Sequence, residues 1–261
     1  MRFTHTVSKG SRYNQIYVPK SMQKEFELGD IVEVILIEKK NKLFYSPHIK
    51  RLSNFKDRLI REIFSFLSKF KEIEQVFVFG SFLTTQIEYH DIDLLIFLKK
   101  ESEELDKKIL DSLIGEFNLK FHILSATREG FLKVLEYSPI ERSMMYYFVS
   151  NKEFKVPSKR EIHEDNIRSL LMMPEDIFKV RFDEGRVFYD SLRKLITIES
   201  FLRGKDIAPE TIDKEIISLL NEKKLKILKE NEYVNNELFR ELKGIFKAKV
   251  ERIHEMLHGK K

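Results

Sequence analysis

A strand-loop-strand segment in the first half of the chain is the feature that most constrains its fold. The apolar runs Val76–Phe79 and Ile92–Leu98 have the length and composition of buried β-strands. Gly80-Ser81 follows the first run, and nine residues then separate Ser81 from Asp91. Because side chains along a strand alternate with a period of two, Asp91 and Asp93 are expected on one face. The pattern therefore predicts two carboxylates side by side at the beginning of the second strand.

Two carboxylates on one strand face suit a divalent cation. Hard cations such as Mg²⁺ take carboxylate oxygens together with triphosphate oxygens, neutralise their charge and align an attacking hydroxyl. Gly80 lets the backbone come close to phosphates, and Ser81 offers an N–H and a hydroxyl. The alternative is purely structural, because aspartates at strand starts and Gly-Ser turns are common. The two interpretations differ in whether the loop binds a nucleotide.

The residues around this segment predict an α/β domain over residues 53–152. An amphipathic helix is expected before the first strand, a helix near Glu103–Phe117 after the second, and a third strand over Leu119–Leu124. The sequence Ser138-Pro139-Ile140-Glu141 has the form of a capping box with proline at the first helical position. Another helix is therefore expected to begin there.

The Gly-Ser pair, the nine-residue spacing and the Asp-Ile-Asp between two apolar strands resemble the pattern of the nucleotidyltransferase superfamily, in particular its minimal prokaryotic type. The resemblance implies that Gly80 and Ser81 contact the triphosphate of a nucleoside triphosphate, with ATP favoured. It also implies that Asp91 and Asp93 bind Mg²⁺. The expected activity is transfer of a nucleoside monophosphate, AMP in the first instance, to a hydroxyl of a macromolecule such as a tRNA or a protein.

One departure from this family pattern bears on catalysis. Active members usually carry a third carboxylate on the next strand, but no Asp or Glu occurs from Phe117 through Arg128. His122 can take that place as a base or metal ligand, or it can be a hydrogen-bonded structural residue. Glu116 and Glu129 are further candidates if the fold differs from that of the family. The alternative function is a catalytically silent DNA-binding regulator that uses the nucleotidyltransferase fold for ligand sensing or docking.

A second departure is His90, which stands where many relatives have serine before the two aspartates. An imidazole at this position can approach a phosphate.

Residues 1–48 predict a small β-rich module. Short strands are expected around Phe3–Val7, over Gln15–Val18 and over Ile31–Ile37, with a short helix over Ser21–Glu27. The pieces Ser8-Lys9-Gly10, Ile16-Tyr17-Val18-Pro19-Lys20 and Gly29-Asp30 resemble the AbrB-like (SpoVT/AbrB) swapped-hairpin family. That resemblance implies an intertwined homodimer with Lys9 and Arg12 facing DNA. A module that only dimerises remains the alternative, because phosphate binding requires clustered positive charge.

Residues 158–261 predict an α-helical C-terminal domain. Helices are expected near Lys159–Met172, Glu175–Leu202, Glu210–Asn221 and Asn235–Leu257. In the second of these, Arg186, Tyr189 and Arg193 share a helix side, which either contacts a bound nucleotide or is an ordinary solvated or core-flanking face.

The end of the chain contains His254-Glu255-Met256-Leu257-His258, which satisfies the H-E-x-x-H pattern of zinc proteases. Catalytic zinc needs a third protein ligand, and in the thermolysin-like and metzincin groups it lies downstream, where only Gly-Lys-Lys follows. A chance match is the favoured interpretation.

The composition excludes several classes of protein. The chain has no cysteine, so it can form neither disulfides nor cysteine-ligated metal sites. Charged residues make up 34% of the chain and no apolar run approaches the roughly 20 residues needed to span a bilayer, so a membrane protein is not expected. The first residues lack the pattern of a secretory signal, which predicts a cytoplasmic location. The net charge of +5 is too small to indicate a polyanion partner without clustering.

Overall fold

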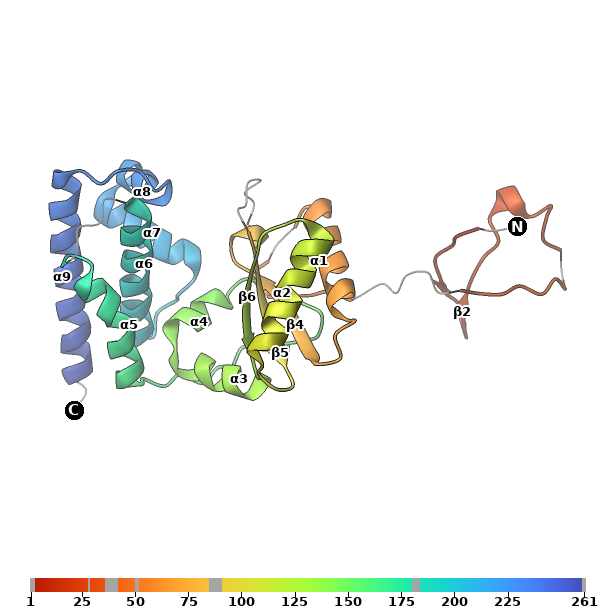
Figure 1. Ribbon diagram of the computed structural model, residues 1–261, viewed down its shortest axis with the longest axis horizontal. Coiled ribbons are helices and arrows are strands. Elements are labelled where there is room, and N and C mark those ends of the chain that lie inside the picture. The colour runs from red at the N-terminus through yellow and green to blue at the C-terminus, as the bar shows by residue number, and fades with distance from the viewer. Residues whose placement is uncertain are drawn as a thin grey trace. The chain divides into compact units, whose positions relative to one another are not determined.

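The computed structural model describes residues 3–27, 29–35, 42–49, 52–84, 91–179 and 184–259. The chain divides into two compact units, Met1–Lys40 and Asn41–Lys261 (Figure 1).

The first unit is built around a short hairpin. Strand β1 (Ser8–Lys9) pairs antiparallel with β2 (Asn14–Gln15), and the 3₁₀ helix η1 (Lys20–Met22) begins directly after Pro19. The strand expected around Phe3–Val7 was wrong, and that expected over Gln15–Val18 is found only at Gln15. A helical turn follows the proline as predicted, but it is shorter than the expected helix Ser21–Glu27.

The expected strand over Ile31–Ile37 is also absent from its described part. Residues 31–35 have no strand structure, and residues 36 and 37 lie outside the described residues. The side chains of Ile31 and Val34 are 100% and 65% exposed. An alternating apolar segment becomes a strand only where a partner strand accepts its hydrogen bonds, and among the described residues none pairs with residues 31–35.

The second unit contains a five-stranded sheet with the order β3-β7-β4-β5-β6. Only β5 and β6 pair in parallel, while the other neighbours are antiparallel. The strands span β3 (Phe44–Tyr45), β4 (Ile73–Phe79), β5 (Ile92–Leu98), β6 (Phe121–Ala126) and β7 (Phe148–Ser150).

Helices cover both faces of this sheet. On one face, α1 (Asn54–Leu67) and α2 (Glu103–Phe117) pack on alternate residues of β5 such as Leu94 and Ile96. On the opposite face, Leu95 and Phe97 of β5 lie in a second core. That core includes residues of α3 (Arg128–Tyr137) and α4 (Pro139–Met144). We call the sheet face of this second core the α3 face.

Capping residues explain where these helices begin. The side chains of Ser53, Ser102 and Thr127 each accept a hydrogen bond from a backbone N–H of the first turn of α1, α2 and α3. At α4 the hydroxyl of Ser138 donates to the carboxylate of Glu141, and Pro139 occupies the first turn. These four start signals are readable in the sequence.

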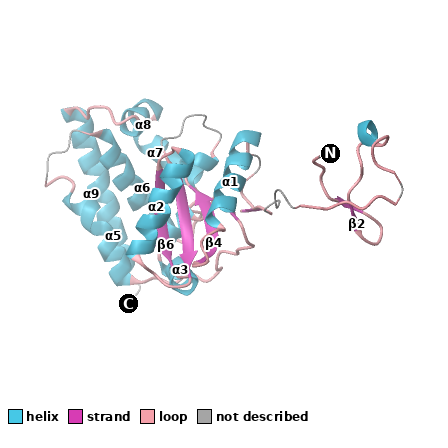
Figure 2. Ribbon diagram, turned by 45° about the vertical axis from the view of Figure 1, so that its right-hand side comes forward, coloured by secondary structure: helices cyan, strands magenta, loops and turns pink. Residues whose placement is uncertain are grey.

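The C-terminal part is a helical bundle around one large apolar core. In Figure 2 its helices lie to one side of the magenta sheet and α1 to the other. The helices are α5 (Glu164–Asp176), α6 (Gly185–Leu202), α7 (Pro209–Leu220), α8 (Glu222–Lys229) and α9 (Asn236–His258). No helix in the described part of the chain is long and apolar enough to cross a membrane.

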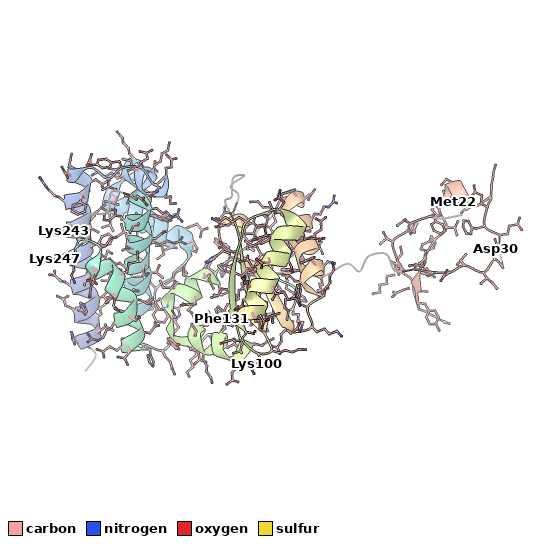
Figure 3. The ribbon with its side chains drawn as sticks, viewed as in Figure 1. Met22, Asp30, Lys100, Phe131, Lys243 and Lys247 are labelled. Carbon is pink, nitrogen blue, oxygen red and sulfur yellow. The ribbon has the colours of Figure 1, made fainter. Side chains whose placement is uncertain are left out.

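A buried ion cluster joins three helices of the bundle. Lys249 of α9 is 7% exposed and lies 2.6 Å from Glu199 of α6 and 2.5 Å from Glu215 of α7. By contrast, Lys243 and Lys247 of the same helix are exposed to solvent (Figure 3).

A buried arginine ties the connection between the sheet domain and the bundle. The guanidinium of Arg142 donates to the carbonyl oxygens of Leu135 at 2.6 Å and Lys159 at 3.0 Å, and also to that of Pro157. Burial lowers the pKa of Arg142, and the neighbouring Arg160 acts in the same direction. All three acceptors are backbone carbonyls.

Candidate nucleotide-binding site

The two aspartates lie at one end of the sheet, next to the Gly-Ser pair. Asp93 pairs across β4 and β5 with Phe79, the residue before Gly80, and Asp91 directly precedes β5. Since side chains alternate along a strand, Asp93 points to the same face as Leu95 of the second core. The carboxylate of Asp93 therefore lies at the open end of the α3 face, beside the loop that leaves β4.

Both the backbone conformation at position 80 and the neighbouring side chain of Asp93 require a glycine there. Its φ of 79° and ψ of −161° fall in a region that is essentially restricted to glycine. A Cβ atom built on Gly80 would lie 2.0 Å from Oδ2 and 3.0 Å from Cγ of Asp93. The Asp93 carboxylate thus occupies the space that a side chain at position 80 would fill. The position of this carboxylate therefore depends on the glycine.

Ser81 begins the 3₁₀ helix η2 (Ser81–Leu83) that shapes the loop. The backbone N–H and the hydroxyl of Thr84 donate to the carbonyl of Ser81 at 3.0 and 2.7 Å. Phe82 and Leu83 are buried in the core against α1, whereas Ser81 is exposed. The loop is anchored by its apolar residues and presents its serine to solvent.

Lys56 of α1 forms a hydrogen bond with the same loop, and this contact was not predicted from the sequence. Its Nζ donates to the carbonyl of Thr84 at 2.8 Å, and burial lowers the pKa of this lysine. The signal that could have found it is its spacing, because Lys56 precedes Leu59, Ile60 and Ile63 on the buried stripe of the helix.

The structure brings His122 to Asp93, as its proposed role requires. The two residues are in register across the parallel pair β5 and β6, and Nδ1 of His122 lies 3.3 Å from Oδ1 of Asp93. The Asp93 side chain is 21% exposed and that of His122 is 74% exposed. Burial and the nearby charge of Asp91 raise the pKa of Asp93, while the hydrogen bond and charge of His122 act against this.

The other candidates for a third ligand lie elsewhere. Glu129 lies in the first turn of α3, beyond the opposite end of β6, and pairs with Lys133 at 2.7 Å. Glu116 is exposed near the end of α2, and His90 lies outside the described residues. Within the described part, no three His, Asp or Glu side chains converge to hold a metal ion.

Two candidate side chains of the bundle have partners within the bundle. Tyr189 is buried and its hydroxyl donates to Oδ1 of Asp213 at 2.9 Å. The protease-like His254 lies 2.8 Å from Oε1 of Glu175. Lys9 and Arg12 are exposed in and next to the hairpin of the first unit.

Residues 61–137 match a family model described as polymerase beta, nucleotidyltransferase. The matched range contains β4, the Gly-Ser pair, both aspartates and His122. The match supports a nucleotidyltransferase domain. Residues 1–60 and 138–261 lie outside it, and no significant match was found among curated proteins or solved structures. The AbrB-like resemblance of the first unit remains a prediction.

The donor set at this end of the sheet fits Mg²⁺ bound together with a triphosphate. Mg²⁺ is usually held by one or two carboxylates, with substrate phosphates and water completing its shell. Asp93 near the start of β5 and Asp91 directly before it supply two such carboxylates. Burial, and after it the charge of Asp91, raise the pKa of Asp93, and a bound cation would favour its charged form. Two protein ligands therefore suffice for a site of this kind.

Proposed function

We propose that the nucleotidyltransferase domain binds Mg²⁺ and a nucleoside triphosphate, ATP in the first instance, and transfers the nucleoside monophosphate to a macromolecular hydroxyl. The observation that carries the proposal is the fit between Gly80 and Asp93, in which a glycine-only backbone leaves room for a carboxylate. A plain turn between two strands has no need of this arrangement. The acceptor is a hydroxyl of a tRNA or a protein.

In this proposal, some residues of the domain bind the cation and the nucleotide, and His122 transfers a proton. Asp91 and Asp93 hold the cation, and the exposed Ser81 next to Gly80 contacts the phosphates through its N–H and hydroxyl. The bound Mg²⁺ supplies charge neutralisation. His122 lies beside Asp93 on the next strand, where active members of the nucleotidyltransferase superfamily usually carry a third carboxylate.

His122 is suited to accept the proton of the attacking hydroxyl. If its Nδ1–H donates to Asp93, its Nε2 is the atom that can act as base. The acceptor oxygen then bonds to the α-phosphorus, the bond from that phosphorus to the leaving pyrophosphate breaks, and the hydroxyl proton moves to Nε2. The carboxylate orients the imidazole and stabilises its charged form.

Calorimetry with Mg²⁺ and ATP tests the binding site. We expect Asp91→Ala and Asp93→Ala to abolish binding, and Glu129→Ala, at the other end of the sheet, to leave it unchanged. Undiminished binding in both aspartate variants would reject the site. Incubation with labelled ATP and candidate tRNA or protein acceptors tests transfer, and binding without label under any metal would favour the silent regulator.

For the first unit we propose an AbrB-like module that forms a homodimer and contacts DNA through Lys9 and Arg12. Its support is the observed hairpin and the exposed apolar side chains after it, which a second copy would cover. Sedimentation of the full chain tests dimer formation. A gel shift with duplex DNA at rising salt tests the contact, because binding to phosphates weakens steeply with salt. Binding that is unchanged in a Lys9→Ala, Arg12→Ala double variant would exclude these residues.

A further inference from the structure

A stacked pair of rings lies at the end of the sheet that carries the proposed site. The rings of His48 and Tyr146 are nearly parallel, with centroids 3.8 Å apart and an interplanar angle of 16°. His48 follows β3, and Tyr146 lies just before β7. The backbone N–H of Ser46 donates to the carbonyl of Phe148 at 2.9 Å, so the two strand ends that carry the rings are fixed to one another.

Strand register places this ring pair on the same sheet end as Asp93. Phe79 pairs with Phe148 of β7 on one side and with Asp93 of β5 on the other. Adjacent strands lie about 4.8 Å apart, so roughly 10 Å separates the backbone of Phe148 from that of Asp93. This separation lies within the reach of a single extended nucleotide whose phosphates are held at Gly80.

The pair is not part of a hydrophobic core. His48 is exposed, Tyr146 is half-buried, and neither belongs to the buried clusters on the two sheet faces. Tyr147 connects the ring pair to the core, because it packs against the core on the α1 side and contacts the His48 ring edge-on, with ring centroids 6.4 Å apart. An exposed, supported aromatic surface beside a phosphate site resembles the stacking surfaces on which proteins hold bases.

The bundle adds acidic groups near the rings. Burial raises the pKa of Tyr146, and the negative charges of Asp206 and Glu210 raise it further. Burial and a hydrogen bond to Glu210 raise the pKa of Tyr147 to about 12. These carboxylates repel phosphates from the ring pair but accept hydrogen bonds from an amino group, which favours a base over an anion.

We propose that His48 and Tyr146 form a stacking platform for the base of the bound nucleoside triphosphate. The proposal rests on the proposed function, since the phosphates are taken to lie at Gly80 and Asp93. It extends that function by assigning a base subsite that residues 61–137 do not contain. Stacking on one aromatic side chain strengthens binding by roughly 5- to 150-fold.

The test compares three probes on the full chain by calorimetry: ATP with Mg²⁺, inorganic tripolyphosphate with Mg²⁺, and adenosine alone. The variants are His48→Ala and Tyr146→Leu. Tyr137→Leu is the matched control, because Tyr137 also pairs with a histidine ring, His163, at 5.1 Å. We expect both platform variants to weaken ATP binding by roughly 5- to 150-fold and to leave tripolyphosphate binding unchanged.

Two results would overturn the platform. One is unchanged ATP affinity in both platform variants, and the other is an equal loss for ATP and tripolyphosphate, which would mean that the rings support the phosphate site or the fold. If the unmodified chain binds neither phosphate probe, the proposed function fails, and adenosine decides the platform separately. Millimolar adenosine should shift the NMR signals of the His48 ring, and signals that do not move would reject the platform.

Discussion

Replacing Gly80 with alanine should damage the fold and the proposed site through two separable effects. The backbone at φ 79° and ψ −161° is strained for any residue with a Cβ, which costs about 1–3 kcal/mol of unfolding free energy. In addition, the new methyl group would lie 2.0 Å from Oδ2 of Asp93, so this carboxylate must leave its position. We expect a loss of Mg²⁺–ATP affinity of about 10- to 100-fold, as is typical when a residue that positions a metal ligand is changed.

A double-mutant cycle separates the two effects. In an Asp93→Ala background the carboxylate is gone, so Gly80→Ala should cost only its backbone strain and the milder contact with the remaining Cβ of residue 93 at 3.3 Å. The difference between the two backgrounds is the coupling energy, expected at about 0.5–3 kcal/mol. Urea unfolding of the four proteins measures it. Gly244→Ala in α9 is the matched control, because nothing lies within 4 Å of its Cβ and the substitution should stabilise by about 1 kcal/mol.

Additive costs would refute this reasoning. If Gly80→Ala destabilises the chain equally with and without the Asp93 carboxylate, the methyl group does not meet that carboxylate. Unchanged ATP affinity in the single variant would likewise show that the glycine does not position a ligand.

Three further predictions concern other parts of the second unit. Burial acts to raise the pKa of Glu199, but Lys249 and the neighbouring arginines lower it below its usual 4.5. Its contribution to the free energy of unfolding is therefore present above pH 4.5 and is lost as the pH falls through the lowered pKa. Glu199→Gln should therefore cost about 3 kcal/mol or more by urea unfolding at neutral pH and much less once the pH has fallen below the lowered pKa of Glu199, whereas the exposed Glu251→Gln should cost at most about 1 kcal/mol at either pH. A pH-independent cost would contradict this. At the base platform, the carboxylate of Glu210 should favour ATP and CTP over UTP by about tenfold, and Glu210→Gln should reduce this preference; equal affinities in the unmodified chain would refute it. His122→Gln should slow transfer by roughly 10²- to 10⁴-fold with ATP affinity retained, and an undiminished rate would exclude the histidine as base.

Elements with strong local signals could be predicted from the sequence. The strand Ile92–Leu98 and the helix Glu103–Phe117 have the expected bounds, because an apolar run and an N-cap serine mark them. The helix α8 was missed, since its short, lysine-rich sequence buries only Leu225 and Leu228. The strand expected over Ile31–Ile37 is not found in its described part, residues 31–35, because local alternation carries no information about a partner strand.

The candidate site was only partly readable. Strand periodicity predicts a common face for Asp91 and Asp93, and the structure places Asp93 as the second residue of β5 with Asp91 directly before the strand. Contacts that depend on register between distant segments could not be predicted, and these include the approach of His122 to Asp93 and the stacking of His48 on Tyr146. Such contacts join residues that are about 30 and 100 positions apart, and nothing local specifies them.

The carbonyl bonds of Arg142 have an evolutionary consequence. Every amino acid has the same backbone carbonyl, so the connection at Pro157 and Lys159 can change its side chains while keeping these bonds. Position 142 has no such freedom, because a lysine cannot reproduce the planar fork that reaches three acceptors at once. Among related chains, the connection between sheet domain and bundle should therefore vary freely in sequence while the arginine beneath it is retained.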